Sequence, residues 1–194
     1  LESLASNLPL AVEEFLNDTV LSKLPAQTPG VAFRDVGRRL ALSKGLRAKH
    51  PVVIVPGFLS TGLEAWRVSE ACNARYSFRS RVWGELSMVA SMLSDPHCFM
   101  EMMSLNASTG LDKDGIRLRP VDGFEGSASF VEGYWLWDRL MINLAELGYE
   151  PSNMELATYD WRLGFPLMEQ RDGFLSKLKA RIERLHFRHK EKVS

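Results

Sequence analysis

The stretch "HPVVIVPGFLSTGLEAW", residues 50–66, places a short apolar run directly before a glycine-containing loop. Residues 52–55 are β-branched and flanked by prolines, which is typical of a buried strand in a parallel sheet. Pro56-Gly57 then opens a loop that reaches a second glycine, Gly62. Many α/β proteins hold a phosphate or an oxyanion where a strand enters such a loop, so the neighbouring residues must distinguish the two.

The residues after the loop argue against a phosphate site. Gly57 and Gly62 have the spacing of a P-loop, which requires a lysine and then a serine or threonine after the second glycine. Leu63 and Glu64 stand there instead, and a carboxylate at that point would repel a phosphate. The dinucleotide pattern GxGxxG also fails, because its second glycine is replaced by Leu59. The sequence therefore disfavours nucleotide binding at this loop.

An oxyanion site remains as the chemical alternative to an ordinary turn. In α/β-hydrolases one oxyanion donor is the N–H that follows the nucleophile, and the second comes from the loop after an early strand. Such a loop needs a glycine for close backbone approach and one residue that presents its N–H to the developing charge. Phe58, directly after Gly57, occupies that place.

Composition restricts the class of protein. The chain has 194 residues, of which 45% are hydrophobic, and this is enough for one domain with its own core. Its 24 basic and 24 acidic residues cancel, so nothing favours a nucleic-acid partner. No apolar run approaches the ~20 residues of a membrane span, and the first ten residues lack a secretory signal. Because the chain begins at Leu1 instead of a methionine, we expect that an upstream segment has been removed or left out.

The remaining elements predict alternating strands and helices. Residues 115–120 alternate apolar and charged side chains and indicate a half-exposed strand. Apolar periodicity and turn residues predict further elements, namely helices over 1–24, 134–147 and 172–189, a buried strand over 155–159 and the start of another strand at 191–194. In the last helix, Leu175, Leu178, Ile182 and Leu185 are expected to face inward. This order favours an α/β fold with a largely parallel sheet.

Two segments have less regular patterns. Residues 31–49 are basic and are interpreted as a solvated connector, the alternative being a surface that contacts anionic lipid. Residues 63–104 are predicted to be irregular and are rich in methionine and aromatic residues, which fits either core packing or a lipid-facing flap. The two cysteines, Cys72 and Cys98, by themselves indicate unrelated thiols. The sequons at Asn17 and Asn106 fit a lumenal or secreted site.

Several motifs in order resemble one family. His50 to Gly57, with Leu63-Glu64 behind, resembles the first motif of the lecithin:cholesterol acyltransferase family, and Tyr159-Asp160-Trp161-Arg162 is similar to its second. Five further stretches are similar to the phospholipid:diacylglycerol acyltransferase branch: Arg81–Gly84, Thr109–Asp112, Gly133–Trp137, Leu147–Pro151 and Arg171-Asp172. The resemblance runs from about residue 50 to residue 194.

The resemblance implies an α/β-hydrolase fold. It divides the chain into a helical and basic lead-in, 1–49, and an N-terminal portion of the hydrolase domain, 50–194. A lid loop at about 66–104 and part of the cap belong to the second segment. The resemblance also implies that Cys72 and Cys98 form a disulfide that closes the lid in a lumenal compartment, with Trp83 between them meeting lipid. Trp66 and Leu59 are further lid or substrate-binding candidates.

The resemblance assigns a role to each motif. Phe58 N–H, with Gly57, would supply one oxyanion donor. Tyr159, Asp160, Trp161 and Arg162 would be the scaffold of the site, with direct substrate contact as the alternative. The nucleophilic serine in a GxSxG-type elbow, the aspartate and the histidine are expected beyond residue 194. Ser194 is not the nucleophile, and the four histidines, His50, His97, His186 and His189, are not expected to be bases.

The implied reaction moves the sn-2 acyl group of a phospholipid to diacylglycerol through a serine acyl-enzyme, without cofactor or metal. A phospholipase of the same family and a truncated, non-catalytic chain that binds lipid or a partner are the alternatives. The expected partners are the two lipid substrates, a membrane surface and the rest of the hydrolase domain, with no nucleic acid. The expected location is the lumenal side of the endoplasmic reticulum membrane, with a secreted or other endomembrane protein as the alternative.

Overall fold

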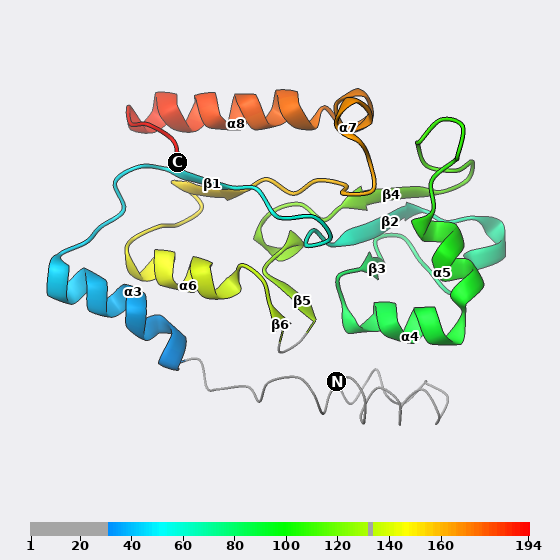
Figure 1. Ribbon diagram of the computed structural model, residues 1–194, viewed down its shortest axis with the longest axis horizontal. Helices are drawn as coiled ribbons and strands as arrows, with labels where there is room; N and C mark the ends of the chain where they lie inside the picture. Colours follow the sequence, from blue (N-terminus) through cyan, green and yellow to red (C-terminus); the bar gives the residue numbers. More distant parts are fainter. Residues whose placement is uncertain (1–30, 132–133) are drawn as a thin grey trace.

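The computed structural model describes residues 31–131 and 134–194 (Figure 1). The helix expected over 1–24 and the sequon at Asn17 lie outside the described residues.

A parallel strand pair lies at the centre of the fold. β1 (Val52–Ile54) pairs with β7 (Met154–Leu156), with Val52 opposite Met154. Both strands were predicted and are present, although the second ends at Leu156 instead of continuing to residue 159. Ser194 lies along the other edge of β1, where its N–H donates to the Pro51 carbonyl at 2.9 Å and its carbonyl accepts from Val53 N–H at 2.8 Å. The end of the segment expected to start a strand, residues 191–194, is therefore bonded to β1 as a parallel strand would be.

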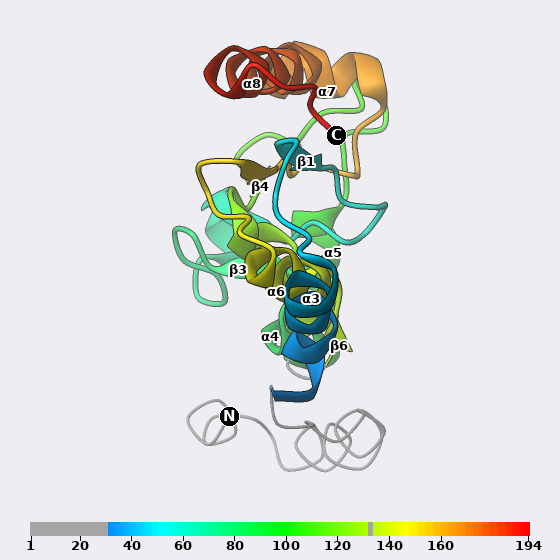
Figure 2. The ribbon, with the colours of Figure 1, turned by 90° about the vertical axis from the view of Figure 1, so that its left-hand side faces the viewer.

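Helices cover both faces of this pair, as Figures 1 and 2 show. α8 (Phe174–His189) lies on one face, and α6 (Asp138–Glu146) with α3 (Val31–Lys44) lies on the other. Ile54 and Leu156 from the strands pack with Met141 of α6 in one buried cluster. Parallel strands have apolar side chains on both faces and need cover on each, so the layers confirm the α/β class.

Two helix boundaries differ from the prediction. The predicted helix over 134–147 begins only at Asp138, because residues before it form β6 (Tyr134–Trp135), which pairs with β5 (Ser129–Val131). The helix predicted over 172–189 is α8, which begins only at Phe174, because Gly173 with a φ of 61° separates it from α7 (Phe165–Asp172). α7 itself was not predicted. Of the α8 residues expected to face inward, Leu185 is fully buried whereas Leu175 and Ile182 are exposed.

The basic segment 31–49 was wrongly interpreted as a connector. Most of it is α3, which packs along α6. Gly37 permits the close contact, since a Cβ there would lie 2.3 Å from the carbonyl oxygen of Asn143. The Gly37 N–H also donates to Asn143 Oδ1 at 2.7 Å, so a helix–helix contact with its own hydrogen bond replaces the expected solvated loop.

Residues 63–104 are regular, contrary to the prediction of an irregular segment. They form β2 (Leu63–Arg67), a 3₁₀ turn η3 (Glu70–Cys72), β3 (Arg81–Trp83), α4 (Leu86–Ser94) and α5 (Pro96–Met103). β4 (Arg117–Pro120), the predicted half-exposed strand, completes an antiparallel sheet of order β3-β2-β4.

This second sheet has its own core. Leu63, Val82 and Leu118 from its strands are fully buried and pack with Met102 of α5. Cys72 and Cys98 form a disulfide inside the same cluster, which joins η3 to α5. This pairing is the one that the family resemblance implied. The methionine- and aromatic-rich composition is thus explained in part by core packing.

Candidate functional site

The glycine loop, residues 56–62, follows β1 at its carboxyl end. Its first part is a tight turn in which the Ser60 N–H donates to the Gly57 carbonyl at 3.1 Å. Leu59 occupies the third position of this turn with a φ of 68°, the left-handed conformation that a type II turn requires. A leucine is disfavoured there by about 1–2 kcal/mol, so surrounding contacts must stabilise the turn.

Three successive carbonyls of the loop accept hydrogen bonds from side chains of other segments. Trp83 Nε1 donates to Leu59 O at 2.8 Å, and Ser127 Oγ donates to Ser60 O at 2.6 Å. Trp161 Nε1 donates to Thr61 O at 3.1 Å, although 100 residues separate the two. These donors come from β3, from the turn after η4 and from the segment after β7, so the loop is bonded to three parts of the fold.

Aromatic rings surround the same loop. The ring of Phe58 meets Trp161 edge-on with centroids 5.4 Å apart, and Trp161 in turn contacts Trp83 at 5.0 Å. Phe58 is otherwise open to solvent, with 70% of its surface exposed. Four predicted site residues, Phe58, Leu59, Trp83 and Trp161, therefore meet at one place.

Two other predicted site residues lie apart from this cluster. Trp66 contacts Phe78 edge-on at 5.4 Å and donates its indole N–H to Glu64 Oε1 at 2.9 Å. Tyr159 packs against Phe174 at the start of α8, and burial raises the pKa of its phenol. Neither side chain is bonded to the glycine loop.

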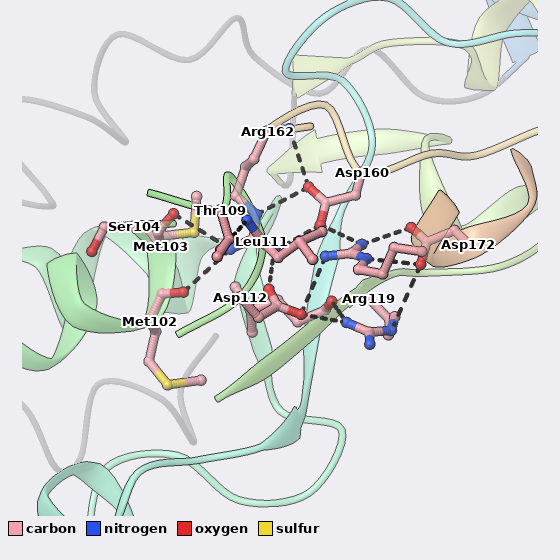
Figure 3. A network of polar contacts seen from close by, with 12 residues as sticks. Met102, Met103, Ser104, Thr109, Leu111, Asp112, Arg119, Asp160, Arg162 and Asp172 are labelled. Atoms are coloured by element: carbon pink, nitrogen blue, oxygen red, sulfur yellow. Dashed lines mark hydrogen bonds and ion pairs between the residues drawn. The ribbon is translucent and has the colours of Figure 1, made fainter. Parts of the chain in front are cut away.

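Asp160 and Arg162 belong to a buried network of charges, shown in Figure 3. Arg162 donates to both oxygens of Asp160, from Nε at 2.9 Å and from Nη2 at 2.7 Å. Arg162 Nη2 also reaches Asp112 Oδ1 at 2.9 Å, and its Nη1 donates to the carbonyls of Met102 and Met103 at 3.4 Å. The pair thus ties the segment after β7 to the end of α5 and to the loop before β4.

A second layer of the network comes from α7 and β4. Arg171 Nη2 donates to Asp160 Oδ2 at 2.8 Å, and its Nη1 donates to Asp112 Oδ2 at 3.2 Å. Asp172 accepts from Arg171, and Arg119 donates to Asp112 Oδ2 at 2.6 Å. The six residues of this aspartate–arginine network carry three negative and three positive charges: Asp112, Asp160, Asp172, Arg119, Arg162 and Arg171.

The network sets the protonation state of its buried groups. Burial alone would raise the pKa of Asp160, but the hydrogen bonds and charges of Arg162 and Arg171 outweigh it and leave that pKa below the ordinary value. Burial likewise opposes the charge of Arg171, and its bonds to Asp172 and Asp160 more than compensate and raise its pKa. Each of these charged groups is therefore paired with an oppositely charged group inside the fold. This pairing fits the interpretation of Asp160 and Arg162 as part of the scaffold of the site.

A cavity of about 340 Å³ lies beside the network, between the end of β7 and α8. Tyr159, Phe174, Lys177 and Arg181 line it together with network residues. Arg181 is paired with Asp122 at 3.3 Å and donates to the Leu156 carbonyl at 3.2 Å. The arginines that line the cavity are thus paired with carboxylates of the same fold.

The histidines have partners away from the loop. His50 pairs with Glu191 at 3.3 Å and His97 pairs with Glu101 at 3.9 Å. His186 and His189 contact the backbone carbonyls of Glu191 and Ser152.

Sequence reasoning missed three contributors. Asp112 and Arg171 stood in motifs quoted for the resemblance, but no role was assigned to them. The signal that could have found them is the pairing of charged residues in motifs that lie far apart in the sequence. Ser127 had no signal at all, because nothing in its local sequence marks a buried serine as a donor to a distant loop.

Several known proteins are similar to this chain in sequence. A sequence model of the lecithin:cholesterol acyltransferase family matches residues 77–194. A phospholipid:diacylglycerol acyltransferase of Schizosaccharomyces pombe is 45% identical over 87% of this chain and 26% of its own length. Its counterpart in Saccharomyces cerevisiae is 42% identical over 96% of this chain and 29% of its own length. An Arabidopsis thaliana phospholipid–sterol O-acyltransferase is 28% identical over 68% of the chain and 22% of its own length.

The chain therefore spans about a quarter of the length of the curated relatives it matches. The matched family region includes β3, the aspartate–arginine network and both helices after β7. The chain belongs to the lecithin:cholesterol acyltransferase family.

Proposed function

We propose that this chain is part of a lipid acyltransferase that moves the sn-2 acyl group of a phospholipid to diacylglycerol. The products are triacylglycerol and a lysophospholipid. Relatives that carry the name phospholipid:diacylglycerol acyltransferase, at 39–45% identity over most of the chain, support this activity.

One observation supports the proposal that the glycine loop, residues 56–62, supplies an oxyanion donor. In the described part of the chain, the Phe58 N–H has no acceptor, while the carbonyls of residues 57 and 59–62 are all bonded. An amide held in this way is suited to a substrate oxygen that gains negative charge during attack. Loss of one such donor typically costs about 10²–10³ in kcat, which is the contribution proposed for Phe58.

The proposed reaction has two steps. A serine Oγ attacks the ester carbonyl carbon and its proton passes to a histidine, while the carbonyl oxygen becomes the oxyanion that Phe58 N–H stabilises. Collapse breaks the bond to the glycerol oxygen, which takes the proton and leaves as lysophospholipid. The diacylglycerol hydroxyl then attacks the acyl-enzyme, and triacylglycerol and free serine result. The serine, aspartate and histidine are assigned to the rest of the full-length protein.

The fold proposal follows from the same comparison. Residues 50–194 would be the N-terminal portion of an α/β-hydrolase domain, which includes a lid loop at about 66–104 and part of the cap. The parallel bonding of Ser194 to β1 supports a further strand of that domain at this edge. The rest of the domain is thus the first proposed partner of this chain.

A membrane surface is the second proposed partner. Exposed apolar side chains gather in the lid segment, among them Trp66, Phe78, Met92, Leu93 and Met100. We propose that the chain contacts the membrane through this exposed apolar surface. Among the described residues no helix is long and apolar enough to cross a bilayer. The Cys72–Cys98 disulfide supports an oxidising compartment, and we assign the protein to the lumenal side of the endoplasmic reticulum membrane, with a secreted or other endomembrane site as the alternative.

The test supplies the full-length protein with vesicles that contain sn-2-labelled phospholipid and diacylglycerol. We expect the label in triacylglycerol, with one lysophospholipid formed per acyl group moved. Label found only in free fatty acid would identify a phospholipase instead. Absence of any released label would overturn the lipid-active assignment. Residues 1–194 alone should be inactive, and turnover by them would contradict the assignment of the nucleophile elsewhere.

A further inference from the structure

We propose that Trp83 and Trp161 are positioning residues, whose indole N–H groups fix the glycine loop so that Phe58 N–H faces the oxyanion. This inference rests on the proposed function, because it concerns the same loop. It gives Trp83 a role in the chemistry of the site that is separate from any contact with lipid.

The first step is that the loop needs external support. Leu59 has a φ of 68°, which glycine or asparagine adopts more readily at this turn position. The Ser60 side chain adds a bond to the Gly57 carbonyl at 2.5 Å, but this bond lies within the turn itself. Bonds that fix the turn relative to the rest of the fold must therefore come from elsewhere.

The second step is that each tryptophan bonds the carbonyl of a loop peptide whose N–H is already bonded. The Leu59–Ser60 peptide donates its N–H to Gly57 O and receives Trp83 Nε1 at its carbonyl. The Thr61–Gly62 peptide donates its N–H to Gly126 O at 2.7 Å and receives Trp161 Nε1 at its carbonyl. A peptide bonded at both ends cannot rotate without breaking two hydrogen bonds.

The third step connects these planes to Phe58. The chain before Phe58 is held in β1, and the chain after it is held by the two bonded planes. The ring of Phe58 also rests edge-on against Trp161, which contacts Trp83. The two indoles therefore restrict both the backbone and the side chain of the residue that would donate to the oxyanion.

The fourth step concerns the segment that carries Trp83. It lies in β3, between the two disulfide-bonded cysteines, and β3 pairs with β2 directly after the loop, with Trp83 opposite Leu63. Backbones approach closely here, because a Cβ on Gly84 would lie 3.0 Å from the Cα of Gly62. The disulfide-closed segment and the oxyanion loop are thus one packed unit.

The experiment uses the full-length protein and two substrates. Trp83→Phe and Trp161→Phe keep an aromatic ring and remove the indole N–H together with the pyrrole part of the ring system, a loss that Trp137→Phe reproduces away from the loop. A water-soluble p-nitrophenyl ester reports on the loop without a lipid surface, and vesicles with phospholipid and diacylglycerol report on the whole reaction. We expect kcat to fall about three- to tenfold for both substrates, as loss of one positioning hydrogen bond implies, with KM changed less than about twofold.

Trp137→Phe is the matched control. Trp137 packs against the core between β1, β7 and α6 and is not bonded to the loop, so its variant should lower the melting temperature and leave kcat unchanged. Ser127→Ala is a second test, because it removes the donor to Ser60 O without touching the aromatic cluster. We expect it to lower kcat for the soluble ester as well.

The outcomes separate the two proposals. If wild-type protein transfers no acyl group to diacylglycerol but the tryptophan variants lose soluble-ester kcat, the transferase assignment fails and the positioning role stands. If wild-type protein is an active transferase and both tryptophan variants keep their soluble-ester kcat, the positioning role is wrong. A loss confined to vesicles would assign Trp83 to lipid contact alone and would also overturn the inference. Should a tryptophan variant fail to fold, the kcat of Ser127→Ala decides.

Discussion

Asp160 and Arg162 form a two-point ion pair in the interior, with Oδ1–Nε at 2.9 Å and Oδ2–Nη2 at 2.7 Å. The Asp160 side chain has no exposed surface and that of Arg162 is 4% exposed. Only one residue separates them in the sequence, yet through Asp112 and Arg171 the pair joins segments that lie 50 or more residues apart. A buried pair with so many partners stabilises the geometry of the region from which Trp161 reaches the loop.

Removal of the central carboxylate should therefore be costly. Asp160→Asn leaves two buried guanidinium groups, on Arg162 and Arg171, with one negative partner fewer. We expect the free energy of unfolding of the full-length protein to fall by about 3–5 kcal/mol, measured by urea denaturation. The exposed pair Lys179–Glu183 is the matched control, and Glu183→Gln should change stability by less than about 0.5 kcal/mol. Equal effects of the two substitutions would show that the network is not a scaffold.

The same carboxylate makes stability depend on pH. The folded-state pKa of Asp160 lies below its ordinary value of 3.8, so the unfolded chain binds the proton more readily. Its contribution is complete above about pH 5 and is lost as the pH falls through the depressed pKa. The difference in stability between wild type and Asp160→Asn should thus be constant from pH 7 to 5 and shrink below pH 4. A difference that stays constant down to pH 2.5 would refute the assignment.

Local patterns in the sequence were sufficient for part of the fold. The β-branched run of β1 and the alternation in β4 are properties of a few neighbouring residues, and both strands were predicted. α8 was predicted from its apolar period, but Leu175 and Ile182 proved exposed, since periodicity shows which residues share a face and not whether that face is covered. α3 was missed because its contact with Asn143 of α6 joins residues 106 positions apart.

The features of the site that could not be predicted from the sequence depend on contacts between residues far apart in the chain. Phe58 and Trp161 were chosen from motifs, but nothing in their spacing showed that their rings touch. The local sequence of 63–104 predicts an irregular segment because β2 and β3 are short and depend on pairing with each other and with β4. Asp112 belongs to a charge network in which its partners Arg162 and Arg171 lie 50 and 59 residues away, so only the folded structure identifies it.

Loss of the disulfide should destabilise the segment between Cys72 and Cys98. Cys72 and Cys98 close a loop with a sequence separation of 26 residues, for which the chain-entropy model gives about 3.5 kcal/mol. We expect the double substitution Cys72→Ala with Cys98→Ala to lower the free energy of unfolding of the full-length protein by about that amount. A peptide map without reducing agent should contain the linked peptide in wild type. Its absence, or equal stability of the double variant, would contradict the assignment.

Asn106 should carry a glycan if the protein enters the secretory pathway. Its Oδ1 accepts from the N–H groups of Ser108 and Thr109 at 2.9 and 3.2 Å, while in the described part of the chain its Nδ2, the atom that a glycan would modify, has no acceptor. We expect a mobility shift on treatment with a peptide N-glycosidase, assigned to Asn106 by mass spectrometry. Ser108→Ala should abolish modification at this residue and Ser108→Thr should retain it. An unmodified Asn106 in protein from a eukaryotic host would count against the lumenal assignment.

Gly126 should be intolerant of any side chain. A Cβ there would lie 2.1 Å from the Val121 carbonyl oxygen and 2.6 Å from Thr158 Cγ2, and the first of these is backbone that cannot rotate away. The Gly126 carbonyl also accepts the Gly62 N–H that ends the glycine loop. We expect Gly126→Ala to lower the free energy of unfolding by about 1–3 kcal/mol and to reduce kcat, because displacement of this carbonyl would also displace the loop. Gly164→Ala is the control, since the nearest atom to its Cβ is 4.0 Å away, and it should keep wild-type kcat. Wild-type kcat in Gly126→Ala, despite lower stability, would show that the loop does not depend on this contact.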